Sequence, residues 1–244
     1  MSIAALVVAL AAGVVMGMFG AGGSILVVPM LVHVAAVDPR TATTASLVVV
    51  GVTSLITCAL DFGRVRIKIA AAFALAGIPG AYVGSLVSQR LEPTTLMLLF
   101  ASAMIMMALT MLRQRRFDAS QEPSVSKIIP VAFGIGILTG TVGVGGGLLI
   151  VPSLLVFGGV TMADAIGTSL VIITINCVSG LVARSPDLFA VPWGITLLFT
   201  LASVVGSLLG LAIAKRMSVM GLRRAFAVFV LGLGLFELAM NLPV

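Results

Sequence analysis

The 244-residue chain is 60% hydrophobic and only 9% charged, with a mean hydropathy of +1.27. A soluble domain carries roughly 25% charged residues, so this composition excludes the water-soluble globular classes. The net charge of +6 does not indicate nucleic acid, because the basic residues form short clusters at the ends of apolar runs without interleaved aromatics. A lipid bilayer is the expected partner.

The first half contains five apolar segments, each expected to be a helix: residues 3–18, 24–36, 42–60, 67–88 and 94–112. The first two hold about 12–16 residues, which reach only ~18–24 Å and fall short of the ~30 Å hydrocarbon core. We predict that these two form a short helical hairpin, either re-entrant or fully crossing, and that the other three span the membrane.

A polar, basic link follows at residues 113–127. The second half repeats the pattern with apolar segments at 128–142, 147–158, 163–183, 190–214 and 222–241. The sequence therefore predicts one integral membrane domain made of two repeats, 1–112 and 128–244, joined by the link.

One motif occurs in both halves at an offset of 123 residues. GAGGSILVVP at 20–29 and GVGGGLLIVP at 143–152 share six of ten positions, and ASLV at 45–48 is matched by TSLV at 168–171. In each copy the glycines separate the two short segments. A glycine break inside paired apolar segments is typical of membrane transporters built on internal repeats.

The charge distribution predicts that the two copies are inverted. Basic residues mark 61–68, the link 113–127 and 215–224 as cytoplasmic, whereas 184–190 carries no net charge and is expected outside. The loops 61–68 and 184–190 are equivalent in the repeat but fall on opposite sides. The expected fold is a polytopic all-α membrane bundle of two inverted repeats, with the sides of the termini left open.

The glycine motif is the first candidate binding feature. A helix that begins within the membrane exposes free N–H groups and a partial positive charge, which suits an oxyanion. The backbone donors would be those of Gly22, Gly23 and Ser24 in the first copy, and of Gly145, Gly146 and Gly147 in the second. Close helix packing is the alternative. We assign to packing the GxxxG pairs Gly13/Gly17, Gly80/Gly84, Gly136/Gly140 and Gly206/Gly210.

Uncharged polar side chains follow the motif in each half. The candidate donors are Thr44 and Ser46 in the first copy, and Thr168, Ser169 and Asn176 in the second. Ser46 is equivalent to Ser169. Thr53 is equivalent to Asn176, two helical turns further along the same face. Interhelical or backbone hydrogen bonding is the alternative role for any of these hydroxyls.

Acidic residues lie at segment ends, as Asp164 does, or in loops, and only Glu237 falls further inside a predicted span, near its end. A cation site or proton relay normally needs an intramembrane carboxylate, so the substrate is expected to be anionic or neutral. The single His33 has no equivalent in the second copy, where Val156 stands. Without a carboxylate pair or metal-ligand spacing, no enzyme, metal site or cofactor is expected.

The doubled G-x-G-G-[SG]-x-L-x-V-P motif, with a [ST]-S-L segment after each copy, resembles the TauE/SafE family of membrane permeases over nearly the whole chain. That resemblance implies a carrier of sulfur oxyanions or organosulfonates in the bacterial inner membrane. The sequence leaves open an anion channel, a permease for another small solute such as a carboxylate, and a homodimeric assembly. The chain departs from symmetry at Ser24, which is matched by Gly147.

Overall fold

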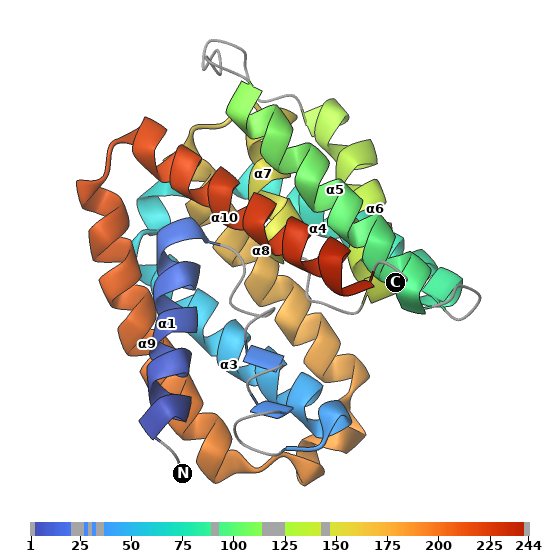
Figure 1. Ribbon diagram of the computed structural model, residues 1–244, viewed down its shortest axis with the longest axis vertical. Coiled ribbons are helices and arrows are strands. Elements are labelled where there is room, and N and C mark those ends of the chain that lie inside the picture. Colours follow the sequence, from blue (N-terminus) through green and yellow to red (C-terminus); the bar gives the residue numbers. More distant parts are fainter. Residues whose placement is uncertain are drawn as a thin grey trace. The chain divides into compact units, whose positions relative to one another are not determined.

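The computed structural model describes residues 3–20, 27–28, 31–32, 37–88, 93–113, 125–142 and 147–241, and these contain no strand. The helices (Figure 1) are α1 (Ile3–Phe19), α3 (Pro39–Leu60), α4 (Ile67–Ser88), α5 (Pro93–Arg113), α6 (Val125–Val142), α7 (Gly147–Val156), α8 (Met162–Ala183), α9 (Trp193–Arg216) and α10 (Val219–Asn241). Two 3₁₀ segments are η1 (Phe62–Arg64) and η2 (Ser185–Ala190). The all-helical prediction is confirmed.

Five described helices are long and apolar enough to cross a membrane: α3, α4, α8, α9 and α10. α7 has ten residues and a length of about 15 Å, so it is the half-length helix expected after the second glycine motif. α1 and α6 have 17 and 18 residues, which exceeds the 12–16 expected for them. α6 begins at Val125, ahead of the predicted residue 128, so its first residues belong to the predicted link.

The third helix of each half starts with a side-chain cap at an equivalent position. Asp38 precedes α3 and accepts a hydrogen bond from the backbone N–H of Thr41 at 3.4 Å, and Pro39 fills the first helical position. Thr161 precedes α8 and accepts from the N–H of Asp164 at 3.2 Å. An oxygen at this position satisfies an N–H that the helix leaves free, so both starts are encoded locally.

The described chain divides into two compact units. The first unit comprises Met1–Val65 with Ile166–Met217, and the second comprises Arg66–Ala165 with Ser218–Val244. The first unit holds α1, α3, most of α8 and α9. The second holds α4, α5, α6, α7 and α10. Each unit therefore combines helices from both halves of the sequence.

In the first unit, α1 lies along α9 with the two backbones almost in contact (Figure 1). A Cβ atom added to Gly13 would come within 2.1 Å of the Ser203 carbonyl oxygen, and one added to Gly17 within 1.9 Å of the Ser207 oxygen. From the other side, a Cβ on Gly206 would come within 2.1 Å of the Leu10 oxygen. Both glycine pairs are therefore packing residues, as the sequence predicts.

The second unit repeats this packing between α4 and α6. A Cβ on Gly80 would lie 2.3 Å from the Phe133 oxygen, and one on Gly136 would lie 2.3 Å from the Gly77 oxygen. Gly80 is the equivalent of Gly206, and Phe133 is the equivalent of Leu10. The first helix of each half thus packs on the fourth helix of the other half. The offset rises from 123 to 126 in the fourth helix because η2 has six residues where η1 has three.

Within the first unit, the equivalent helices α3 and α8 run antiparallel. Residues further along α3 neighbour residues earlier along α8. The neighbouring pairs are Leu47 with Gly180, Gly51 with Cys177, and Ser54 with Thr174. Gly51 is the equivalent of Thr174, and Ser54 of Cys177, so the last two contacts are the same contact with the halves exchanged. Antiparallel equivalents are what inverted copies require; the inversion relative to a membrane stays a prediction.

Ion pairs connect the end of α9 with the residues just after α3, and the charge pattern predicts that both lie on the cytoplasmic side. In the first unit, Lys215 at the end of α9 contacts Asp61 just after α3, with 3.1 Å between Nζ and Oδ1. Arg64 lies 3.8 Å from the other oxygen of Asp61. The first turns of α8 reach the same place, because a Cβ on Gly167 would lie 3.4 Å from Arg64.

This grouping makes a topology prediction with single cysteines. In a background lacking Cys58 and Cys177, which are both buried, Lys68→Cys and Phe189→Cys should react with an impermeant thiol reagent from opposite membrane faces. Phe189 on η2 is 95% exposed, so its reactivity tests sidedness and not burial. The measurement compares labelling in right-side-out and inverted membrane vesicles. Labelling of both variants from one face would refute the inversion.

Candidate functional site

The first glycine motif begins where α1 ends. The N–H of Gly20 donates the last helical hydrogen bond, to the Met16 oxygen at 2.8 Å. Gly20 itself adopts a φ of +61°. This left-handed conformation favours glycine and ends the helix. The predicted donors Gly22, Gly23 and Ser24 lie outside the described residues, as do Gly145 and Gly146 and the residue His33.

Ser169 from the second half lies directly against this motif. Its Oγ is 2.7 Å from the carbonyl oxygen of Gly20 and 2.7 Å from that of Ile166. The side chain is fully buried. The structure therefore brings a predicted hydroxyl of the second copy to the first glycine motif, within the first unit.

The hydroxyls of the two predicted serines are directed at carbonyl oxygens. Ser46 donates to Thr43 at 2.7 Å, which is the equivalent of the bond from Ser169 to Ile166. In this conformation each proton is used by the backbone, so binding an anion would require the hydroxyl to rotate. Thr44 and Thr168, the predicted neighbours, are both fully buried.

The second copy of the motif leads into α7. Gly147, a predicted backbone donor, is the first residue of this helix and is buried. Every residue from Gly147 to Leu155 is buried, so a ten-residue helix lies within protein and not against lipid. Irregular backbone at membrane depth is tolerated in such an enclosed position. Asn176, the remaining predicted donor, is partly exposed on α8.

A buried row of hydroxyls on α9 was not predicted from the sequence. Thr196, Thr200, Ser203 and Ser207 are all buried and stand at spacings of four, three and four residues. This spacing places them on one helical face, and it was readable from the sequence. Ser207 Oγ lies 2.9 Å from Thr57 Oγ1 on α3, and Ser203 donates to the Ala9 oxygen at 3.2 Å. The row thus joins α9 to α3 and α1.

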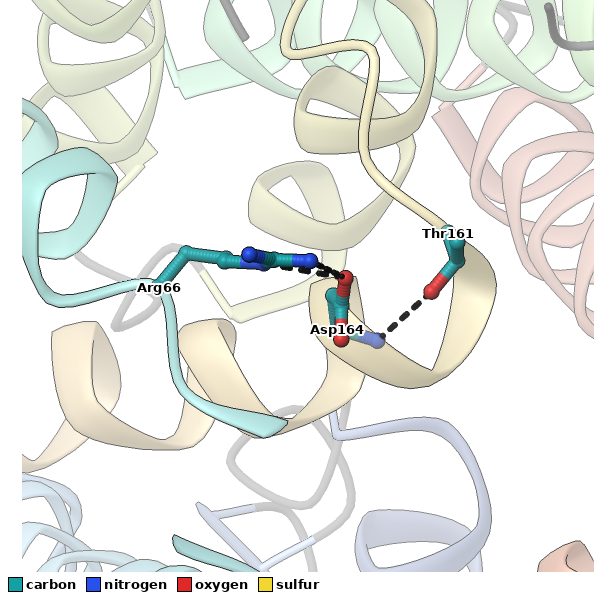
Figure 2. Close-up of polar contacts among 3 residues, drawn as sticks. All are labelled: Arg66, Thr161 and Asp164. Carbon is teal, nitrogen blue, oxygen red and sulfur yellow. Dashed lines mark hydrogen bonds and ion pairs between the residues drawn. The ribbon is translucent and has the colours of Figure 1, made fainter. Parts of the chain in front are cut away.

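The single carboxylate within the five candidate spans, Asp164, is held at a helix start (Figure 2). Nε and Nη2 of Arg66 lie 3.1 and 2.9 Å from Asp164 Oδ2, within the second unit. The Asp164 side chain is 15% exposed and the Arg66 side chain 58% exposed. Asp164 is therefore a charge paired at the helix end, as its predicted place at a segment boundary implied. Among the described residues, no three His, Cys, Asp or Glu side chains converge on a metal position.

The chain is similar to known proteins over nearly its whole length. The model of a family described as "Sulfite exporter TauE/SafE" matches residues 5–236. A "Probable membrane transporter protein" of Xylella fastidiosa (strain 9a5c) is 34% identical over 237 residues, covering 92% of this chain and 90% of the relative. The "Probable membrane transporter protein YunE" of Bacillus subtilis (strain 168) is 28% identical over 240 residues, covering 86% and 88%. No solved structure gives a significant match.

Proposed function

Because the chain belongs to the TauE/SafE family of membrane transporters, we propose that it is a secondary carrier of small anions, specifically sulfur oxyanions or organosulfonates. The family description, sulfite exporter, supports this substrate class. The bacterial relatives support a place in the bacterial inner membrane, with the basic link 113–127 in the cytoplasm.

The observation that carries the proposal is the polarity of the buried positions. The five candidate spans hold one carboxylate, Asp164, which is paired with Arg66, whereas buried hydroxyls are numerous. A cation in these spans would have no free carboxylate to offset its charge. Hydroxyl and backbone N–H groups donate hydrogen bonds, and the oxygens of sulfite or a sulfonate accept them.

The proposed donors are the backbone N–H groups at Gly22–Ser24 and Gly145–Gly147, with the side chains of Thr44, Ser46, Thr168, Ser169 and Asn176. Two helix N-termini in related copies would direct partial positive charges at one mid-membrane position. Alternating access would follow when one part of the helical bundle moves against another. The serines would then exchange their bonds to carbonyl oxygens for bonds to the substrate.

Ligand-dependent thermal unfolding of the detergent-purified protein tests the substrate class. We expect one of sulfite, sulfate, thiosulfate, taurine or sulfoacetate to stabilise the fold selectively over acetate and chloride. A ligand that binds the folded state alone adds about 2.7 kcal/mol at one hundred times its dissociation constant. Stabilisation by a carboxylate alone would overturn the sulfur assignment.

Uptake into proteoliposomes separates a carrier from a channel. Flux of the stabilising anion should saturate with its concentration, because each molecule occupies one site per transport cycle. Gly146→Val should abolish this flux while the protein still inserts and folds, since the side chain would obstruct the proposed N-terminal donors. Flux that rises without saturation would indicate a channel.

A further inference from the structure

The hydroxyl of Thr53 lacks a hydrogen-bond partner at a buried position of α3. Thr53 has no exposed surface, and its Oγ1 is the one buried side-chain nitrogen or oxygen without a partner among the described residues. A buried donor left unpaired costs more than an average hydrogen bond contributes, and it calls for an explanation such as a ligand.

Other threonines in these helices avoid that cost. Thr57, one turn further along α3, donates to the Thr53 carbonyl oxygen at 2.7 Å, and Thr200 donates to the Thr196 oxygen at 2.7 Å. This bond to the carbonyl four residues earlier is the usual solution for a threonine in a membrane helix. Thr53 does not make it, so its hydroxyl is directed elsewhere.

Thr53 lines a narrow void inside the first unit. The walls come from α1, from Val27 of the segment after the first glycine motif, from α3 and from α9; they are Ala12, Gly13, Met16, Val27, Val49, Val50, Thr53 and Ser203. The space between these side chains is too narrow to admit a water molecule. Water therefore does not satisfy Thr53 in this conformation.

A second hydroxyl borders the same void. Ser203 donates its proton to the Ala9 carbonyl oxygen at 3.2 Å, which fixes its orientation and leaves Thr53 as the free donor there. No lining residue carries a charge. A free O–H donor without a neighbouring carboxylate suits the oxygen of an anion or of a neutral polar solute better than a cation.

The position is also central in the repeat. Thr53 is the equivalent of Asn176, and it neighbours Ser54, whose Oγ lies 2.9 Å from Thr174 Oγ1 where α3 and α8 cross. The contacts Gly51–Cys177 and Ser54–Thr174 become each other when the two halves are exchanged. Thr53 therefore lies beside the pseudo-symmetric centre of the α3–α8 pair. Thr53 also lies within the middle part of the span Thr41–Leu60. Substrate sites of repeat-based transporters lie at this depth.

We propose that Thr53 contacts the transported substrate: its hydroxyl donates a hydrogen bond to one substrate oxygen, and the void is the collapsed form of that part of the binding site. This inference rests on the proposed carrier function. Binding would widen the void by separating Val27 or α1 from α3, and it would satisfy the one donor that the empty conformation leaves unpaired.

The test compares Thr53→Val with Thr53→Ser and Thr57→Val in the purified full-length chain. Valine has the shape of threonine without the hydroxyl. Unliganded Thr53→Val should therefore unfold at the wild-type temperature or above it, because no hydrogen bond is lost. Its affinity for the best sulfur oxyanion of the panel should fall about tenfold or more. Thr53→Ser should bind within about threefold of wild type, since it keeps the donor.

Thr57→Val is the matched control on the same helix. Thr57 Oγ1 is bonded to the Thr53 carbonyl oxygen and to Ser207 Oγ, so its loss should lower the unfolding temperature and leave the substrate affinity of the folded protein unchanged. The two threonines thus separate a ligand-binding role from a structural one.

The outcomes separate this inference from the proposed function. Wild-type affinity in Thr53→Val, or a fall in unfolding temperature like that of Thr57→Val, would overturn the role of Thr53 and leave the carrier proposal standing. If the wild type binds only the carboxylate of the panel and Thr53→Val weakens that binding, the contact holds and the sulfur assignment fails. Binding of no panel member by the wild type overturns both.

Discussion

Gly206→Ala should prevent the first unit from folding stably, whereas Gly194→Ala in the same helix should not. The added Cβ at Gly206 would lie 2.1 Å from the Leu10 carbonyl oxygen and 3.0 Å from the Val14 nitrogen, which are backbone atoms that no rotamer change can move. Separating α1 from α9 breaks their whole contact, so we expect a cost of about 3 kcal/mol or more. At Gly194 an added Cβ meets nothing within 4 Å.

Thermal unfolding of the two variants in detergent, followed by size-exclusion chromatography of a fluorescent fusion, measures the difference. Gly194→Ala should match or exceed wild type, since alanine stabilises a helix by up to about 1 kcal/mol relative to glycine. Gly80→Ala should reproduce the loss in the second unit, because its Cβ would lie 2.3 Å from the Phe133 oxygen at the equivalent contact. Equal unfolding temperatures for Gly206→Ala and Gly194→Ala would contradict the backbone packing described here.

Gly20→Ala should destabilise the protein and abolish transport. The φ of +61° costs an alanine roughly 1–2 kcal/mol. Its Cβ would also lie 2.6 Å from Ser169 Oγ and 2.8 Å from the Ile166 carbonyl oxygen. The two penalties act together at the point where α1 ends and the first glycine motif begins. Uptake into proteoliposomes should therefore be lost, and the unfolding temperature should fall.

Two further variants separate the causes. Asparagine adopts the left-handed conformation more readily than alanine but has a Cβ at the same position. Gly20→Asn should therefore remain defective. Gly20→Ala with Ser169→Ala removes the nearest atom while the Ile166 oxygen stays, so recovery should be partial. Full activity in Gly20→Ala would refute the close approach of Ser169 to the glycine motif.

Helix positions were predictable from the chain because their causes are local. The apolar runs, the cap Asp38 with Pro39, and the break at the second glycine motif each lie within a few residues of the boundary that they set. The lengths of α1 and α6 were underestimated, since helix ends depend on caps and neighbours more than on hydropathy. Spacing alone correctly assigned seven GxxxG glycines to packing: Gly13, Gly17, Gly80, Gly84, Gly136, Gly206 and Gly210.

The candidate site was only partly predictable. Sequence equivalence selected Ser46 with Ser169 and Thr53 with Asn176, because an offset of 123 residues is visible in the letters. It did not show that Ser169 bonds to Gly20, or that Thr53 remains unpaired while Thr57 bonds to Ser207. These facts depend on which helices meet, and the serines' use of backbone carbonyl oxygens depends on their rotamers.

The sequence by itself therefore determined an all-helical membrane protein of two related halves with glycine breaks, because hydropathy and glycine spacing act over single helices. Only the tertiary structure decided that the halves exchange helices, so that α1 packs on α9 and α4 on α6. Within lipid the hydrophobic effect does not choose between apolar partners. The choice follows from how closely two backbones approach, and that fit involves residues far apart in the chain, such as Gly206 and Leu10.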